Sequence, residues 1–195
     1  MSPEEVKLII EALLFVNEKP LTLEAIKGIL EDFNTEKIRE ILEELKKDYE
    51  TQNRGIRIQE VAGGFQMVTN PYVSPYLKKF FKKHRIERLS QSALETLSII
   101  AYKQPVTKKE IEILRNVDCS GVIKHLLEKN LIRIVGRRDS MGRPFVYRTP
   151  KEFLEYFGLK SLEDLPKLED FSKLAKGEES DGEPTGITQE DRSDR

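Results

Sequence analysis

The sequence predicts an α+β protein, mostly helical, built as two tandem winged-helix domains joined by a helical connector, with a disordered acidic C-terminal tail. The chain of 195 residues repeats itself, since EALLFVNEKPLTLEAI matches TLSIIAYKQPVTKKEI at an offset of 85 residues. Each copy has three stretches with helical spacing of apolar residues, followed by two with alternating spacing. A period of ~85 residues has the size of a small domain, whereas solenoid repeats take ~20–50 residues.

The first copy opens with a helix whose apolar residues recur at helical spacing, namely Val6, Ile9, Ile10, Leu13 and Leu14. Pro20 blocks its continuation, and Thr22 is a suitable N-cap for a short second helix. A third helix follows Asn34, and two strands then flank a tight turn at Gly63-Gly64. The first copy also has about five more residues than the second near residues 49–54, where we expect a longer loop.

The second copy repeats this order. Ser92 to Glu95 fits a capping box at the start of its first helix, and Thr107 to Glu110 fits another at its second helix. A third helix is expected from about residue 120 to 129. The strands LIRIVGRR and RPFVYRT follow, around a turn at residues 139–142. Regular alternation would place Ile132 and Ile134 on one face, and Arg133 and Arg137 on the other.

These patterns predict four segments. They are an N-terminal winged-helix domain over residues 1–76, a basic connector over 77–89, a C-terminal winged-helix domain over 90–166 and a tail over 167–195. We expect the connector to be a helix that is basic outside and aromatic inside through Tyr76, Phe80 and Phe81. The tail has almost no large apolar side chains, so burial cannot offset the entropy of ordering it.

The composition favours a soluble protein of the reducing cytosol. The sequence has no apolar run near the ~18 residues that span a bilayer. The N-terminus lacks the basic start and small-residue cleavage site of a secretory signal. Cys119 is the single cysteine, which excludes an intrachain disulfide.

Enzyme signatures are missing from the sequence, so we expect no catalytic activity and no cofactor. Neither the GxxxxGK[ST] nor the GxGxxG phosphate-binding pattern occurs. Cys119 and His125 would supply two ligands, whereas a structural zinc site needs four. Glu95 and Glu110 both fall at capping positions, where a local role suffices.

Charge is distributed unevenly along the chain. Residues 1–76 and 160–195 each carry a net charge of −5, and residues 77–159 carry +9. The third helix of each copy, which would enter the major groove in a DNA-reading protein, has a net charge of −1 or zero. The positive charge lies instead on the connector and the second hairpin. These basic residues could equally contact phosphates, contact acidic side chains of a partner, or face solvent. They are Lys78, Lys79, Lys82, Lys83, Arg133 and Arg138.

The second copy resembles a known family in detail. Its segments LSQSALETLSIIAYKQPVT, GRRDSMGRPFVY and TPKEFLEYFGLKSLEDLP, within residues 89–166, are similar to those of segregation and condensation protein B. EALLFV and LTLEAI in the first copy extend the likeness more loosely, and about 165 residues match in order. Proteins of that family are accessory subunits of bacterial structural-maintenance-of-chromosomes (SMC) complexes.

The resemblance implies a non-catalytic protein that acts in chromosome condensation and partition during cell division. It implies a homodimer that forms through the N-terminal domain. The resemblance also implies that the protein binds the kleisin subunit, segregation and condensation protein A. The kleisin in turn links it to the SMC ATPase, and through that complex to DNA in the nucleoid. We expect the region around the AYKQPVT turn to contact the kleisin through Lys103, Gln104, Arg115, Arg137 and Arg143.

Two other functions remain open at this point. The basic middle of the chain would also suit a winged-helix transcriptional regulator or a nucleoid protein that binds DNA directly. A purely structural dimer without a fixed partner is the third possibility. A fold of this kind does not decide between them, because function depends on the site that it carries.

Overall fold

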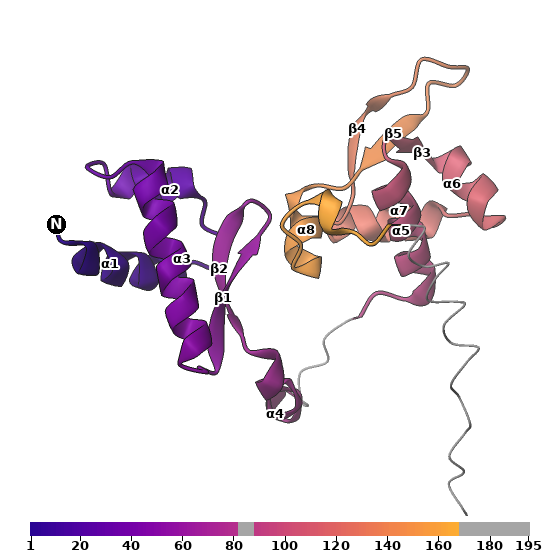
Figure 1. The fold of residues 1–195 in the computed structure, drawn as a ribbon. Helices are drawn as coiled ribbons and strands as arrows, with labels where there is room; N and C mark the ends of the chain where they lie inside the picture. The colour runs from indigo at the N-terminus through magenta and orange to yellow at the C-terminus, as the bar shows by residue number, and fades with distance from the viewer. Residues whose placement is uncertain (82–87, 168–195) are drawn as a thin grey trace, which may run out of the picture. The chain divides into compact units, whose positions relative to one another are not determined.

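The computed structural model describes residues 1–81 and 88–167, as two groups of elements that we treat separately (Figure 1). The predicted tail beyond residue 167 and part of the predicted connector, including Lys82 and Lys83, lie outside these residues. No helix within the described ranges is long and apolar enough to cross a membrane.

The first group contains three helices and a hairpin in the predicted order. The helices are α1 (Pro3–Val16), α2 (Leu23–Ile29) and α3 (Thr35–Thr51), and the strands are β1 (Ile56–Val61) and β2 (Gly64–Thr69). The side chains of Ser2, Thr22 and Asn34 cap the three helices by accepting backbone N–H groups. The extra residues of the first copy extend α3 through Thr51 rather than lengthening a loop alone, which corrects the expectation for that segment.

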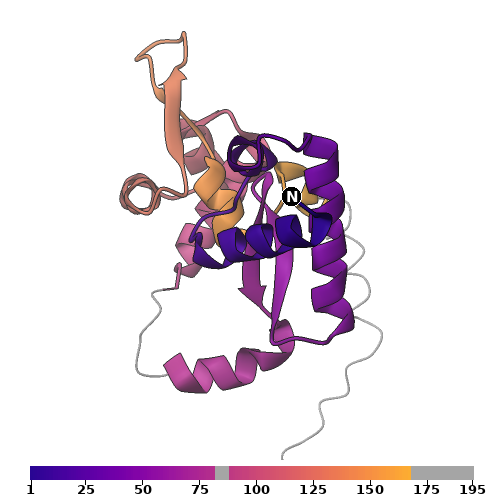
Figure 2. The ribbon, with the colours of Figure 1, turned by 90° about the vertical axis from the view of Figure 1, so that its left-hand side faces the viewer.

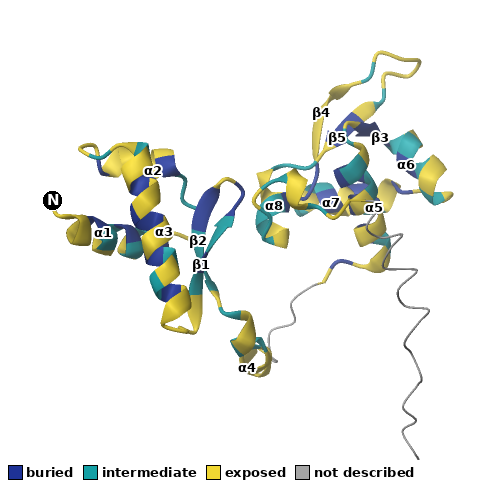
Figure 3. Ribbon diagram, in the orientation of Figure 1, coloured by how far each residue is buried: buried dark blue, intermediate teal, exposed yellow. Residues whose placement is uncertain are grey.

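A single apolar core joins these elements. Val6, Ile10 and Leu14 of α1 are buried together with the inner face of α3 and with Phe65 of β2. The predicted face of α3 is confirmed, since Ile38, Leu42, Leu45 and Tyr49 are all buried. The outer side of α1 is also apolar, but it is exposed (Figure 3).

The first hairpin turns one residue earlier than predicted. Ala62 and Gly63 form the turn, both at positive φ, and Gly64 already pairs with Val61 in the ladder. Gly64 is needed for another reason, since a Cβ atom there would lie 2.9 Å from the carbonyl oxygen of Leu21. Leu21 and Phe65 exchange backbone hydrogen bonds of 2.8 and 2.9 Å at this contact.

The segment after this hairpin differs from the prediction. It forms a short 3-10 helix, η1 (Pro71–Val73), and the helix α4 (Ser74–Phe80). The aromatic side chains expected inside are exposed, with 65% of Tyr76 and 79% of Phe80 accessible and Phe81 also exposed. The expectation was wrong because the described part of this helix has too few apolar neighbours to bury its aromatic side.

The second group has the same order with additions. Its helices are α5 (Gln91–Lys103), α6 (Lys108–Arg115) and α7 (Ser120–Glu128), followed after the strands by α8 (Lys151–Phe157) and the 3-10 helix η3 (Leu162–Asp164). The strands β3 (Val106–Thr107), β4 (Arg133–Arg137) and β5 (Phe145–Arg148) form one antiparallel sheet in the order β3-β5-β4. The capping box at Thr107 and Glu110 is confirmed. The box at Ser92 is wrong, because Ser90 caps α5 by accepting the Ala93 N–H.

The hairpin of β4 and β5 contains a β-bulge that overturns one prediction. Arg133 pairs with Arg148 and Arg137 pairs with Phe145, but the register shifts between Ile134 and Gly136. Directly opposed residues of an antiparallel pair place their side chains on the same face, and one extra residue reverses the faces beyond it. Arg133 and Arg137 therefore lie on opposite faces of the hairpin, not on the same one.

Candidate functional site

The AYKQPVT segment forms the turn between α5 and β3, and its polar side chains are anchored. Gln104 uses both ends of its amide. The nitrogen donates to the Ala101 carbonyl, and the oxygen accepts from the backbone N–H and the hydroxyl of Thr149 at 2.9 and 3.1 Å. Gln104 thus ties the turn to the end of β5, whereas Lys103 is exposed.

A second anchor joins this turn to the β4–β5 hairpin. Arg138 donates to the Glu110 carboxylate at 2.6 Å and to the Pro105 carbonyl at 3.1 Å. Glu110 also accepts the N–H and the hydroxyl of Thr107. These hydrogen bonds, first those from Thr107, lower the pKa of Glu110, so the carboxylate stays ionised and Arg138 is held in an ion pair.

A surface groove lies beside this anchor. A cavity of about 320 Å³ is lined by Lys103, Pro105, Val106, Glu110, Ile113 and Leu114. We call this the α6 groove. It combines apolar walls with one free cation at its edge, Lys103, for which no ion pair is found among the described residues.

The apolar wall of the groove is a ridge that sequence reasoning missed. Ile113 is 69% exposed and Leu114 is 57% exposed, although both are large apolar residues. Two further surface cavities, of about 450 and 550 Å³, adjoin the ridge on the sides of Ile113 and Leu114 respectively. The signal was present in KKEIEILR, where Ile111 alone faces the core and the other two apolar residues lie off that stripe.

Arg115 has an internal position. Its guanidinium donates to the Thr96 hydroxyl at 2.9 Å and to the Glu95 carboxylate at 2.8 Å, and only 10% of its side chain is exposed. Thr96 is fully buried. The contact with Glu95 lowers the pKa of that carboxyl, because the guanidinium favours its ionised form. Arg115 therefore joins α6 to α5.

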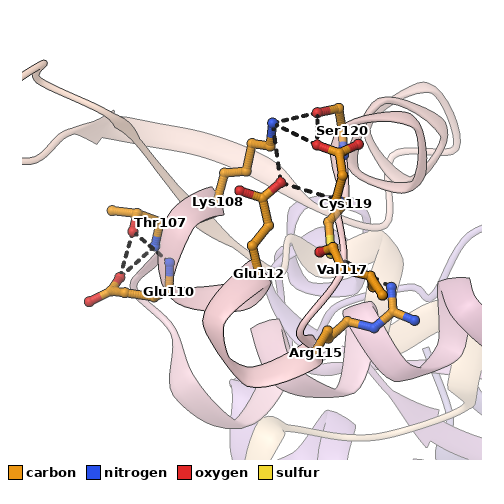
Figure 4. Close-up of polar contacts among 9 residues, drawn as sticks. Thr107, Lys108, Glu110, Glu112, Arg115, Val117, Cys119 and Ser120 are labelled. Carbon is orange, nitrogen blue, oxygen red and sulfur yellow. Dashed lines mark hydrogen bonds and ion pairs between the residues drawn. The ribbon is translucent and has the colours of Figure 1, made fainter.

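The start of α7 carries a polar cluster that bears on DNA reading (Figure 4). Lys108 lies 3.2 Å from Glu112 and 3.3 Å from Asp118, and it also donates to the Ser120 hydroxyl. The Ser120 hydroxyl and N–H, followed by Lys108, lower the pKa of Asp118 to about 2. An ionised carboxylate at the N-terminus of this helix repels phosphates, and base edges are read by that end of the helix in helix-turn-helix proteins.

The remaining predicted basic residues lie on two surfaces. Lys78 and Lys79 are exposed in the last turn of α4, where positive charge suits the helix dipole. Arg133, Arg137 and Arg143 are exposed on the second hairpin, and Arg137 donates to the Arg143 carbonyl at 3.2 Å. Of the predicted basic residues, Lys103 lines the α6 groove, and Arg138 contacts Glu110, which also lines it. The other hairpin arginines do not line the groove.

Within residues 1–81 and 88–167, no three side chains of histidine, cysteine, aspartate or glutamate are placed to hold a metal ion. Cys119 is buried, and its thiol donates to the Val117 carbonyl at 3.4 Å while receiving the Arg115 guanidinium at 3.6 Å.

The family model and the similar proteins that match this chain carry the same family name. Residues 8–168 match the model of "Segregation and condensation complex subunit ScpB". Segregation and condensation protein B of Syntrophotalea carbinolica is 46% identical over 180 residues, covering 92% of this chain and 90% of that protein. The protein of the same name from Clostridioides difficile is 40% identical over 179 residues, covering 91% and 100%.

Solved structures with the same name are also similar. The crystal structure of ScpB from Mycobacterium tuberculosis is 30% identical, covers 82% of this chain and 98% of that one, and has a TM-score of 0.41. A crystal structure of a dimer of the ScpB N-terminal domain complexed with ScpA peptide is 36% identical, covers 40% and 95%, and has a TM-score of 0.37.

Proposed function

Because the chain belongs to the ScpB family of segregation and condensation complex subunits, we propose that it acts as a non-catalytic adaptor in the bacterial SMC complex. In this role it is a homodimer that binds the kleisin and, through the kleisin, the SMC ATPase. It participates in chromosome condensation and partition during cell division and is associated with the nucleoid. Residues 1–76 and 90–166 are its two winged-helix domains. The observation that carries the adaptor role is the exposed apolar ridge of α6.

The α6 groove is the kleisin contact that we propose. Ile113 and Leu114 are large, apolar and exposed at the point where three surface cavities meet. Protein interfaces place apolar residues at their centre and charged residues at the rim, and the groove has Lys103 at its edge. A kleisin segment with an apolar residue and an adjacent carboxylate fits this arrangement. Arg137 and Arg143 remain candidates for its acidic flank.

The dimer surface that we propose is the outer side of α1. This helix buries Val6, Ile10 and Leu14, yet it also exposes a second apolar stripe on the opposite side. Its members are Leu8, Ala12, Phe15 and Val16. Phe15 is 76% exposed and Val16 is 71% exposed. Exposed stripes of large apolar side chains mark protein interaction sites, so a second copy of the chain is the partner that would complete the burial of this one.

The adaptor role is tested by titrating the kleisin of the same organism into the purified protein in a calorimeter. The wild type should bind. Ile113→Lys should raise the dissociation constant at least about tenfold, or 1.4 kcal/mol, because it places a strongly hydrated ammonium in the centre of the contact. Tyr72→Lys is the matched control, since it adds the same charge in η1 at a position that is 81% exposed, and it should bind as the wild type does.

Two results would count against these assignments, and they are separable. If the wild type does not bind the kleisin at all, the adaptor role is wrong. If the wild type and Ile113→Lys bind equally while both keep their helical circular dichroism, the α6 groove is not the contact. Alanine at Arg137 and Arg143 together tests the acidic flank in the same way. Unchanged affinity would remove both residues from the interface.

A further inference from the structure

The hairpin of β4 and β5 carries a concentration of positive charge that the adaptor role uses only in part, through Arg137 and Arg143. Between residues 131 and 149 the chain has five arginines and a single carboxylate, Asp139. We call these residues the basic hairpin. Its arginines are Arg133, Arg137, Arg138, Arg143 and Arg148. Both views show the hairpin extending beyond the helices α5, α6 and α7 of its own group (Figures 1 and 2).

Four of these five arginines are not neutralised by the described part of the chain. Arg138 is paired with Glu110. The other four are exposed, and none forms an ion pair with a carboxylate among residues 1–81 and 88–167. Arg133 also lies directly opposite Arg148 in the ladder. Like charges at directly opposed positions repel, so an anion bound between them relieves a cost that the free protein carries.

The β-bulge distributes this charge over two faces. Arg133 and Arg148 share one face, and Arg137 lies on the other, where its guanidinium stacks 4.1 Å above the Phe145 ring. Arg143 follows Gly142 at the tip, and both residues have positive φ. A flat partner surface contacts one face of a hairpin. A hairpin that is cationic on both faces and at its tip is better suited to a groove with anions on both walls.

We propose that the basic hairpin binds the backbone phosphates of duplex DNA without reading its sequence. Duplex DNA provides a groove lined by two phosphate chains, with one negative charge about every 1.7 Å of its axis. Arginine suits this ligand because its planar fork donates to phosphate oxygens in pairs. The neighbouring helix α7 adds no base reading, since Asp118 and Glu112 stand at its start and its Lys124 lies 3.9 Å from Glu128.

The proposal predicts a definite salt dependence for the full-length protein without its kleisin. In fluorescence anisotropy with a labelled duplex of mixed sequence, four phosphate contacts give a slope of log affinity against log salt of about −3 to −4. Replacing Arg133 and Arg148 together with alanine should reduce that slope by about 2 and weaken binding at least about tenfold at low salt. Lys124→Ala is the matched control on α7 and should leave the slope unchanged.

Three outcomes overturn the proposal. The first is that the wild type does not bind the duplex at about 50 mM salt, where phosphate contacts are strongest. The second is that Arg133→Ala/Arg148→Ala binds with the wild-type slope, which would place the contacts elsewhere. The third is that a poly-glutamate peptide at the same charge concentration displaces the duplex fully, which would make the hairpin a site for acidic protein segments. The first two outcomes do not bear on kleisin binding in the calorimeter, whereas the third would instead favour the assignment of Arg137 and Arg143 to the acidic flank of the kleisin.

Discussion

At the scale of single residues, Arg115, which we expected at the kleisin contact, forms hydrogen bonds inside its own group of elements. Its guanidinium satisfies the Thr96 hydroxyl inside the second group and reaches Glu95 on α5. Arg115→Met should therefore lower the free energy of unfolding by about 1–2 kcal/mol, since hydrogen bonds to a charged donor are lost. Arg133→Met is the matched control, because that exposed side chain has no such partner in the part of the chain that the structure describes, and it should change stability by less than about 0.5 kcal/mol. Urea unfolding of the two variants compares them, and equal stabilities would show that the Arg115 contacts contribute nothing.

Asp118 gives a prediction about pH at the same scale. Its pKa of about 2 in the folded protein lies below the usual 3.8, because Ser120 and Lys108 favour the ionised form. The unfolded chain thus takes up this proton at a higher pH than the folded chain does. The stabilisation by Asp118 is complete above about pH 4 and is lost as the pH falls towards about 2. Wild type should lose more stability across this window than Asp118→Asn, and parallel stability profiles of the two proteins in urea would contradict the assignment.

At the scale of elements, the helices of each copy could be predicted because apolar spacing and capping residues act locally. Thr22 and Thr107 cap the helices that the sequence assigns to them. What sequence reasoning missed depends on pairing across the chain. The bulge after Ile134 is set by which residue of β5 each residue of β4 meets, and no local pattern encodes that choice. The same holds for the α6 groove, which needs the turn at Pro105 beside α6.

Gly64 and Gly28 differ in whether a distant part of the chain leaves room for a side chain. A Cβ atom at Gly64 would lie 2.9 Å from the backbone oxygen of Leu21, so Gly64→Ala must displace the bridge between Leu21 and Phe65. We expect a loss of about 1–3 kcal/mol in the free energy of unfolding. Gly28 lies inside α2 with no atom within 4 Å of such a Cβ, so Gly28→Ala should stabilise the protein by about 0.5–1 kcal/mol. Thermal unfolding of both variants measures the two effects, and a shift of the same sign in both would refute the close contact.

At the scale of the whole molecule, the charge pattern separates the surfaces by partner. The acidic first copy, with its apolar stripe on α1, suits a second copy of the chain, whereas the cationic second copy carries the groove and the basic hairpin. Dimerisation and kleisin binding therefore use different side chains, whereas Arg137 and Arg143 serve both the acidic flank of the kleisin and the phosphates of DNA in our proposals. A variant of the α1 stripe should leave kleisin and DNA binding intact, because mutations at sites without shared partners act independently.

Because the proposed dimer surface on α1 is separate from the kleisin surface on α6, dimerisation can be tested by itself. Phe15→Lys places an ammonium in the middle of the proposed α1 contact, where a second copy would have to desolvate it without a partner. The variant should be a monomer at micromolar concentrations at which light scattering shows the wild type as a dimer, with a dissociation constant raised at least about 100-fold. Its helical circular dichroism should be unchanged, since Phe15 lies on the exposed side of α1. Ile113→Lys is the reciprocal control, a dimer that has lost the kleisin. If Phe15→Lys remains dimeric, the copies meet through another surface, and the apolar stripe of α1 must be covered by a different partner.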